Sequence, residues 1–223
     1  MYRWELMIEV KSVLIMGHGG CRMDFVAGWL GKLDGFIDTG WHINPVTGES
    51  YGERTTKMID SNGAYIRDEL LKFGYKLTDN ANKMLASGCH GYKLNSQLTG
   101  CNTNNLIIIR INVTQDFIDK IGWDFIVKTW LETTQSKCEV HNKIREMVDF
   151  ITRIGLIMEV DYPTIDVDYE KLLSMDGAYY IADKLGLTPT PEQYKLWQDA
   201  LLIASSPDEI ELHGQLWRKQ DFF

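Results

Sequence analysis

The chain has 223 residues, of which 44% are hydrophobic, and it carries 23 Lys and Arg against 31 Asp and Glu, a formal net charge of -8. This length and apolar content suit one α/β domain over residues 1–223 with a large core. The acidic balance excludes a general attraction to nucleic acid or to an anionic membrane surface, so any anion site must be local.

Neither the cysteines nor the hydropathy pattern indicates export or membrane insertion. The N-terminus carries Glu5, Glu9 and Lys11 where a signal peptide needs an unbroken apolar stretch, and no apolar run approaches the ~20 residues that cross a bilayer. The cysteines lack CxxC spacing; they are Cys21, Cys89, Cys101 and Cys138. We therefore expect reduced thiols, a cytoplasmic location and no bound metal.

The first predicted elements are an apolar strand from Ser12, a glycine-rich turn and a helix over 24–33, in which Phe25, Trp29 and Leu33 share one face. Turn amides and the first N–H groups of such a helix can bind a phosphate or sulfate without any side-chain charge. No Gly-Lys-Ser/Thr follows the turn, so a plain strand-to-helix connection is the alternative.

Residues 38–54 are rich in turn formers and include Trp41 and Tyr51. They predict a long functional loop or lid, with these two aromatic residues as candidate walls for an acceptor substrate. An ordinary surface excursion is the alternative.

The middle of the chain predicts two helices over 55–74, another from about Asn80, a strand over 84–90 and a strand over 105–112. The last of these has a continuous Leu/Ile run, which is typical of a central parallel strand covered on both faces.

Helices are then expected over 114–131 and 139–158, and a strand over 164–169 in which Ile165 and Val167 face one side while Asp166 and Asp168 face the other. Further helices are expected near 170–185 and 191–204. Strands that alternate with helices predict a three-layer α/β fold, with a central parallel sheet and helices on both faces.

In such folds the residues just after the parallel strands gather at one edge of the sheet, where ligands bind. Here those residues are His18–Arg22, Cys89–His90 and Arg110–Asn112. The chemistry of these three groups suggests an anion site.

Five segments, in order, resemble motifs of the P-loop sulfotransferase family, and the resemblance runs from the first strand to the end of the chain. His18-Gly-Gly-Cys-Arg22 corresponds to the family's phosphate-binding loop, and Cys89-His90 to its Thr-His pair. Ile109-Arg-Ile-Asn-Val113 is similar to the family's Arg-Asn-Pro motif, and Trp217-Arg-Lys-Gln220 to its Arg-Lys-Gly loop. Asp168-Tyr-Glu-Lys-Leu-Leu173, followed by Lys184-Leu-Gly-Leu187, is similar to the family's late Tyr-Glu-Asp-Leu-Leu segment. The family's loop Lys or Arg is replaced by His18, and its hydroxyl residues by Cys21 and Arg22.

The resemblance implies a P-loop nucleoside triphosphate hydrolase-like fold and transfer of a sulfuryl group from phosphoadenosyl phosphosulfate (PAPS) to a hydroxyl of a small molecule or sugar. It implies His90 as general base, with His18 and Arg22 acting on the leaving group. The residues implied in cofactor binding are Gly17, His18, Gly19, Gly20, Cys21 and Arg22 for the leaving phosphate, and Arg110, Arg218 and Lys219 for the second phosphate.

Each of these roles has an alternative. His90 can be a hydrogen-bonded interior histidine, and Arg110 can pair with Asp166 or Asp168 on a neighbouring strand. Arg218 and Lys219 can be ordinary solvated tail residues. Zinc ligation by His18, Cys21, Cys89 and His90 is disfavoured because paired ligand spacing is lacking.

The alternative to sulfuryl transfer is a non-catalytic or repurposed P-loop-fold protein that binds a nucleotide or another anion, since the altered loop has lost the usual lysine and hydroxyls. Kinase activity ranks last, because Mg²⁺ is normally held by a loop Ser or Thr that this chain lacks.

Overall fold

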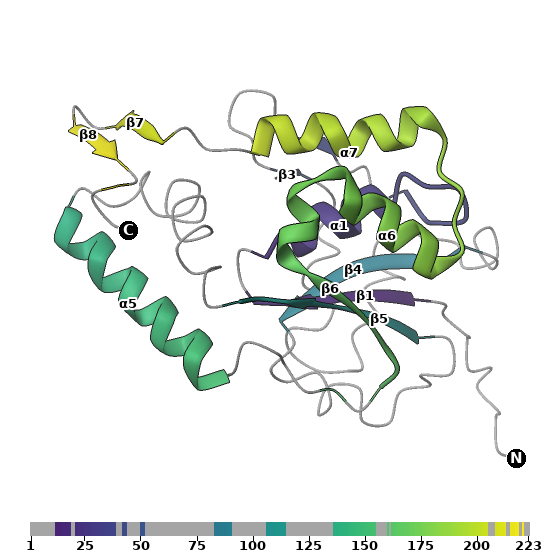
Figure 1. Cartoon of the computed structure of the whole chain (residues 1–223), viewed down its shortest axis with the longest axis horizontal. Helices are drawn as coiled ribbons and strands as arrows, with labels where there is room; N and C mark the ends of the chain where they lie inside the picture. Colours follow the sequence, from purple (N-terminus) through teal and green to yellow (C-terminus); the bar gives the residue numbers. More distant parts are fainter. Residues whose placement is uncertain are drawn as a thin grey trace, which may run out of the picture.

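A computed structural model of the chain describes residues 12–18, 21–38, 42–43, 50–51, 83–90, 106–114, 136–154, 160, 162–204, 208–212, 215–218 and 220 (Figure 1). Its central element is a four-stranded parallel sheet in the order β4-β1-β5-β6. The strands are β1 (Ser12–Gly17), β4 (Leu85–His90), β5 (Leu106–Asn112) and β6 (Thr164–Asp168). The predicted parallel α/β sheet is thus confirmed, including the strand over 84–90, whose small residues gave a weak signal.

The sheet continues by one short parallel contact beyond β4. Phe36 forms an isolated parallel bridge with Met84, supported by hydrogen bonds from Ile37 N to Met84 O (2.9 Å) and from Met84 N to Gly35 O (2.8 Å). The chain therefore passes from the first helix to the outer edge before it returns in β4. β1 lies in the interior of the sheet because it pairs with β4 on one side and β5 on the other.

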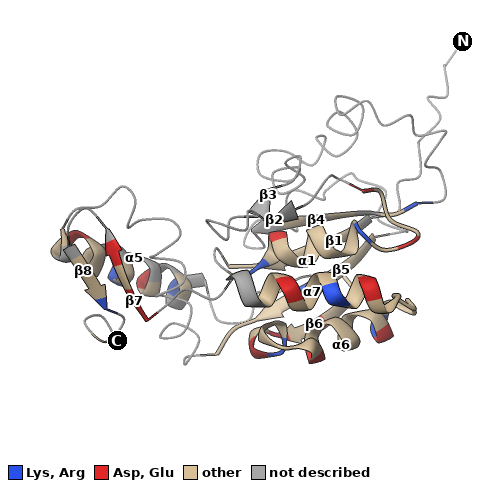
Figure 2. Ribbon diagram, turned by 90° about the horizontal axis from the view of Figure 1, so that it is seen from above, with Lys and Arg blue, Asp and Glu red and all other residues tan. Residues whose placement is uncertain are grey.

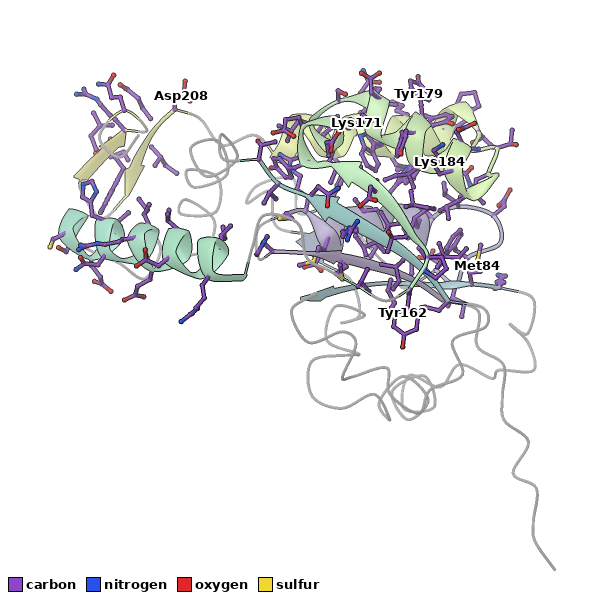
Figure 3. All side chains as sticks on the ribbon, turned by 60° about the horizontal axis from the view of Figure 1, so that its bottom comes forward. Met84, Tyr162, Lys171, Tyr179, Lys184 and Asp208 are labelled. Carbon is purple, nitrogen blue, oxygen red and sulfur yellow. The ribbon has the colours of Figure 1, made fainter. Side chains whose placement is uncertain are left out.

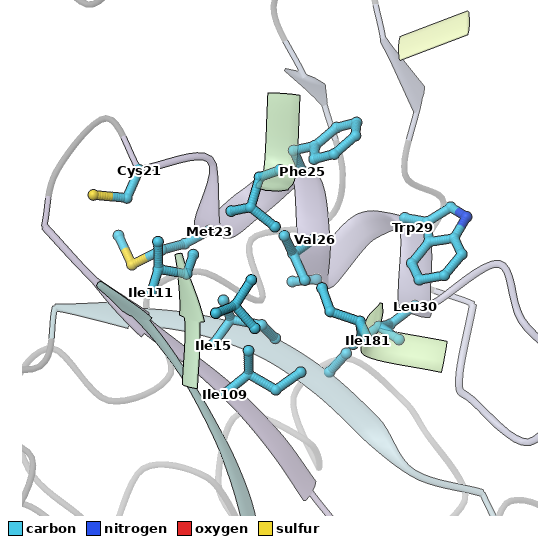
Figure 4. Packing of buried hydrophobic residues seen from close by; sticks show 14 of the residues in the cluster. Ile15, Cys21, Met23, Phe25, Val26, Trp29, Leu30, Ile109, Ile111 and Ile181 are labelled. Atoms are coloured by element: carbon cyan, nitrogen blue, oxygen red, sulfur yellow. The ribbon is translucent and has the colours of Figure 1, made fainter. Parts of the chain in front are cut away.

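Helices α1 (Met23–Leu30), α6 (Met175–Leu185) and α7 (Pro191–Ala204) lie together over one face of the sheet (Figures 1 and 2). The buried side chains of this layer pack on those of the strands, with Ile15 and Ile109 facing Val26, Leu30 and Ile181 (Figure 4). The predicted helices over 55–74, from Asn80 and over 114–131 fall outside the described residues. Helices on the second face, and hence a third layer, remain a prediction.

Aromatic rings fasten α1 to α7. The Trp197 ring meets Phe25 and Trp29 edge-on, with centroids 4.4 Å and 4.9 Å apart. Trp29 donates its indole N–H to Gln193 O and Trp197 to Ser174 O, both at 2.9 Å. Since both indoles are fully buried, these bonds satisfy donors that would otherwise be costly to bury.

The helix predicted near 170–185 is two elements, a 3-10 helix η3 (Tyr169–Leu173) and α6. Ser174 separates them as the N-cap of α6, with its hydroxyl accepting from Asp176 N at 3.2 Å. A Cβ on Gly177 would lie only 2.5 Å from Lys171 O, so the close approach of α6 to η3 requires glycine there. The outer side of these two elements carries Lys171 and Tyr179 (Figure 3).

Helix α5 (Lys137–Ile154) corresponds to the helix expected over 139–158, of which residues 155–158 lie outside the described part. The hairpin of β7 (Glu209–Leu212) and β8 (Gln215–Arg218) was not predicted. Figures 1 and 2 both draw α5 and this hairpin apart from the α1, α6 and α7 layer.

Two short antiparallel strands, β2 (His42–Ile43) and β3 (Ser50–Tyr51), lie within the 38–54 segment predicted as a loop or lid. Trp41 and most of that segment are outside the described residues. Among the described helices, none has the length and apolar character that a membrane span requires.

Candidate anion-binding site at the β1–α1 turn

The turn between β1 and α1 is short and internally hydrogen-bonded. His18 follows β1 and is 3% exposed, and its carbonyl accepts from Cys21 N at 3.1 Å. Arg22 then adopts a left-handed conformation (φ 59°, ψ 27°), which is uncommon for a residue with a Cβ, and α1 begins at Met23. The first helical bond runs from Val26 N to Arg22 O at 3.1 Å. Residues 23–25 therefore form the first turn of the helix, whose N–H groups have no carbonyl acceptor within the helix.

The first turn of α1 is pressed against β4. A Cβ on Gly88 would lie 3.1 Å from Met23 Cβ and 3.2 Å from Asp24 Oδ1. Glycine in this strand thus allows the start of the helix to approach the sheet closely. Gly88, one of the small residues that made this strand hard to predict, therefore has a packing reason, and a glycine inside a strand is the signal for such a close approach.

Cys21 belongs to the core rather than to a solvent-facing loop. Its side chain is fully buried, and Gly17 would place a Cβ 3.2 Å from Cys21 Cβ. Burial raises the pKa of the Cys21 thiol far above its ordinary value, the hydrogen bond with the His18 backbone being a smaller, opposing effect. The amide of Cys21 is used within the turn, because it donates to the carbonyl of His18.

The structure brings the strand ends together as expected. Gly17 is the register partner of His90 on β4, and Met16 is the partner of Arg110 on β5. The backbone positions proposed for the base and for a phosphate-binding cation thus flank the end of β1. The side chains of Cys89 and His90 lie outside the described part, so the role of His90 as a base stays a prediction.

Arg110 forms a forked ion pair with Asp166 on the next strand. Arg110 Nε donates to Asp166 Oδ1 at 2.6 Å and Nη2 to Oδ2 at 3.1 Å, and Asn112 Nδ2 also donates to Oδ1 at 3.0 Å. The alternative for Arg110, pairing with Asp166 or Asp168 on a neighbouring strand, is confirmed for Asp166. These bonds, that of Arg110 first, lower the pKa of the Asp166 carboxyl below its ordinary value.

Of the other predicted cations, Arg22 belongs to the turn itself, and its guanidinium carbon lies 5.9 Å from the ring centroid of Phe25 in α1. Arg218 Nε is 3.0 Å from Glu209 Oε1 across the β7–β8 hairpin, which stands apart from β1 in Figures 1 and 2. Gly19, Gly20 and Lys219 are outside the described residues, as is the side chain of Tyr51.

Within the described ranges no three His, Cys, Asp or Glu side chains are close enough together to hold a metal ion. The chain matches no protein-family model, and no curated protein matches it in sequence.

Proposed function

We propose that this protein binds a phosphate- or sulfate-bearing ligand, in the first place a nucleotide, at the β1–α1 turn, and that the site serves sulfuryl transfer from PAPS to a hydroxyl of a small molecule or sugar. The observation that carries the proposal is the position of β1. It is an interior parallel strand whose carboxyl end turns directly into a helix N-terminus and is flanked by His90 and Arg110. Ligands of parallel α/β sheets gather at such an end, and a helix N-terminus favours an anion.

The residues fit one end of PAPS better than the other. The turn offers the start of α1 to the phosphosulfate end, with His90 alongside in register. The second phosphate would depend on Arg110 and Arg218, and each of these already carries a carboxylate partner at 2.6 Å and 3.0 Å. As they stand, these two cations do not fit a second phosphate.

This mismatch favours a second candidate function, binding of a nucleotide or another anion without transfer. The replacement of the loop lysine by His18 supports the same candidate. The two candidates share the site at the turn and differ in which ligands occupy it.

Thermal stabilisation of the whole chain tests both candidates, because a ligand that binds only the folded state raises the melting midpoint. The ligands are 3′,5′-diphosphoadenosine, AMP, ATP with Mg²⁺, and sulfate. A shift with the diphosphate alone supports sulfuryl transfer, and similar shifts with AMP and the diphosphate support binding without transfer. No shift with any nucleotide contradicts both candidates.

A further inference from the structure

The outer face of α6 carries an exposed tyrosine between charged side chains. The buried residues of this helix belong to the side that faces the core, and they are Gly177, Ala178, Ile181 and Ala182. The opposite side carries Asp176, Tyr179 and Asp183, all of them exposed. Tyr179 is 52% exposed, the largest fraction among the large apolar side chains that the structure describes (Figure 3). The helix is therefore amphipathic, with a ring at the centre of its solvent-facing side.

Tyr179 is the outer end of a row of three aromatic rings that begins in the core. The indole of Trp29 is fully buried, and its centroid lies 6.3 Å from the ring of Tyr194 on α7. The half-buried Tyr194 ring lies 4.8 Å from that of Tyr179, with the two planes at 56°. Packing of this kind restricts the rotamers of the outer ring. A group that packs on Tyr179 therefore loses less binding energy to side-chain ordering.

Two carboxylates stand one helical turn to either side of Tyr179. Asp176 is three residues before it and Asp183 four residues after it, and side chains at these spacings are neighbours on a helix surface. In the described ranges no lysine or arginine nitrogen lies within 4.0 Å of either carboxylate. The exposed ring is thus surrounded by negative charge. A cation suits both features, because the face of an aromatic ring also attracts cations.

The lysines of the same helix layer are engaged elsewhere. Lys171 Nζ lies 4.3 Å and Lys184 Nζ 5.5 Å from the centroid of the Tyr180 ring. Lys195 Nζ lies 2.7 Å from Asp199 Oδ2 on α7. No other lysine or arginine occurs in η3, α6 or α7, so these elements do not neutralise the outer face of α6. Tyr180 also shows that a ring of this layer attracts ammonium groups.

We propose that the outer face of α6 docks a basic peptide segment of a partner protein, with an arginine or lysine side chain on the Tyr179 ring between Asp176 and Asp183. The charge of the face selects a basic partner. The ring favours arginine, because a planar guanidinium stacks on aromatic faces. One ring and two exposed charges give weak binding that falls as salt is added. The docking face is separate from the β1–α1 turn and does not depend on the ligand proposed there.

The test is fluorescence anisotropy of a fluorescein-labelled peptide of alternating arginine and serine, titrated with the whole chain at low salt. The same peptide with citrulline in place of arginine is the uncharged probe. The wild-type protein is expected to bind the arginine peptide in preference to the citrulline peptide. Tyr179→Ala should weaken binding of the arginine peptide about fivefold, and Tyr179→Phe, which keeps the ring, should bind it as the wild type does.

The carboxylates are tested with a double variant, Asp176→Asn with Asp183→Asn, which should weaken binding of the arginine peptide about threefold or more. Glu146→Gln with Asp149→Asn is the matched control, because it also removes two exposed carboxylates from one helix, α5, and changes the net charge equally. The control is expected to weaken binding less than the α6 double variant does.

Equal losses in the two double variants would show a general attraction to the acidic chain and overturn the proposal. Absence of binding by the wild type, or undiminished binding by Tyr179→Ala, overturns it as well. Self-association that Tyr179→Ala abolishes would make a second copy of this chain the occupant and would also overturn it. Circular dichroism checks that each variant is folded. Should Tyr179→Ala fail to fold, the comparison of the two double variants decides.

Discussion

Replacement of Gly177 by Ala tests the packing of η3 on α6, which positions the layer over the sheet. The added Cβ would lie 2.5 Å from Lys171 O and 3.0 Å from Leu172 Cα, both backbone atoms that cannot rotate away. Helix propensity alone favours Ala over Gly in a helix by about 0.5 to 1 kcal/mol. The two effects therefore oppose each other, and the contact distance decides the sign.

Overpacking of a fixed core typically costs about 1 to 3 kcal/mol, and a contact this short with backbone belongs at the upper end of that range. After the propensity gain is subtracted, the variant should lose about 2 kcal/mol of unfolding free energy. For a chain of this length that corresponds to a fall in Tm of about 4 to 8 °C.

Thermal unfolding followed by circular dichroism measures this fall. Asp183→Ala is the control, because Asp183 is exposed in the same helix and Ala there should be neutral or slightly stabilising. Gly186→Ala provides a second comparison, since a Cβ there has open space but the positive φ of 65° strains any L residue. A Gly177→Ala protein that melts at or above the wild-type temperature would refute the reasoning.

Three further predictions follow from side chains already described. Asp166→Asn should lower stability at pH 7 by less than about 1 kcal/mol, because the pair is partly exposed. The pKa of Asp166 is lowered in the folded state, so the stability that the pair contributes is fully present above pH 3.8, the ordinary pKa of the group, and is lost as the pH falls below it. The unfolding free energies of the variant and the wild type, measured with urea, should therefore converge in acid. A difference that stays constant with pH would contradict this. Brief alkylation followed by peptide mass spectrometry should label the exposed Cys138 and spare the buried Cys21 until the protein unfolds, and early labelling of Cys21 would show that its burial is wrong. Ser174→Ala should cost about 1 kcal/mol through loss of the α6 N-cap, whereas an unchanged Tm would mean that the cap contributes nothing.

The strands β5 and β6 were predictable because their burial matches local patterns of residue type. The Leu/Ile run of β5 reflects a strand between two neighbours, and the alternation in β6 places Ile165 and Val167 toward the core and Asp166 and Asp168 toward solvent. Both patterns appear in the fold because residue type and spacing determine which side chains of a strand can face the core.

The break before α6 was missed because it depends on contacts between elements. The sequence from Tyr169 onward keeps a helical apolar pattern through Leu173, so nothing local requires a stop there. The close packing of Gly177 on Lys171 O, a contact between two elements, accompanies the stop and has no counterpart in the apolar pattern. Ser174 followed by Asp176 is the local signal that was available, since serine is a preferred N-cap.

The sequence predicted at which edge of the sheet the candidate residues meet, but it did not predict which side chains pair there. Parallel strands must end at one edge, so the approach of His90 and Arg110 to the end of β1 follows from fold class. Which aspartate pairs with Arg110 depends on strand register, which places Asp166 opposite it and Asp168 opposite Asn112. A shift of two residues along the strand would have placed Asp168 opposite Arg110 instead, and no local pattern specifies the register.

The edge-to-face indoles of Trp29 and Trp197 give this molecule an intrinsic optical reporter. Their ring planes meet at 80° and their centroids are 4.9 Å apart. Trp29 lies on α1, which follows the turn, and Trp197 lies on α7, which packs against α1. Rings so close and so oriented couple their electronic transitions, and the resulting near-ultraviolet dichroism depends on the angle between them. Any tilt of α1 against α7, including one that followed binding of the proposed anion, would therefore change the spectrum without a label.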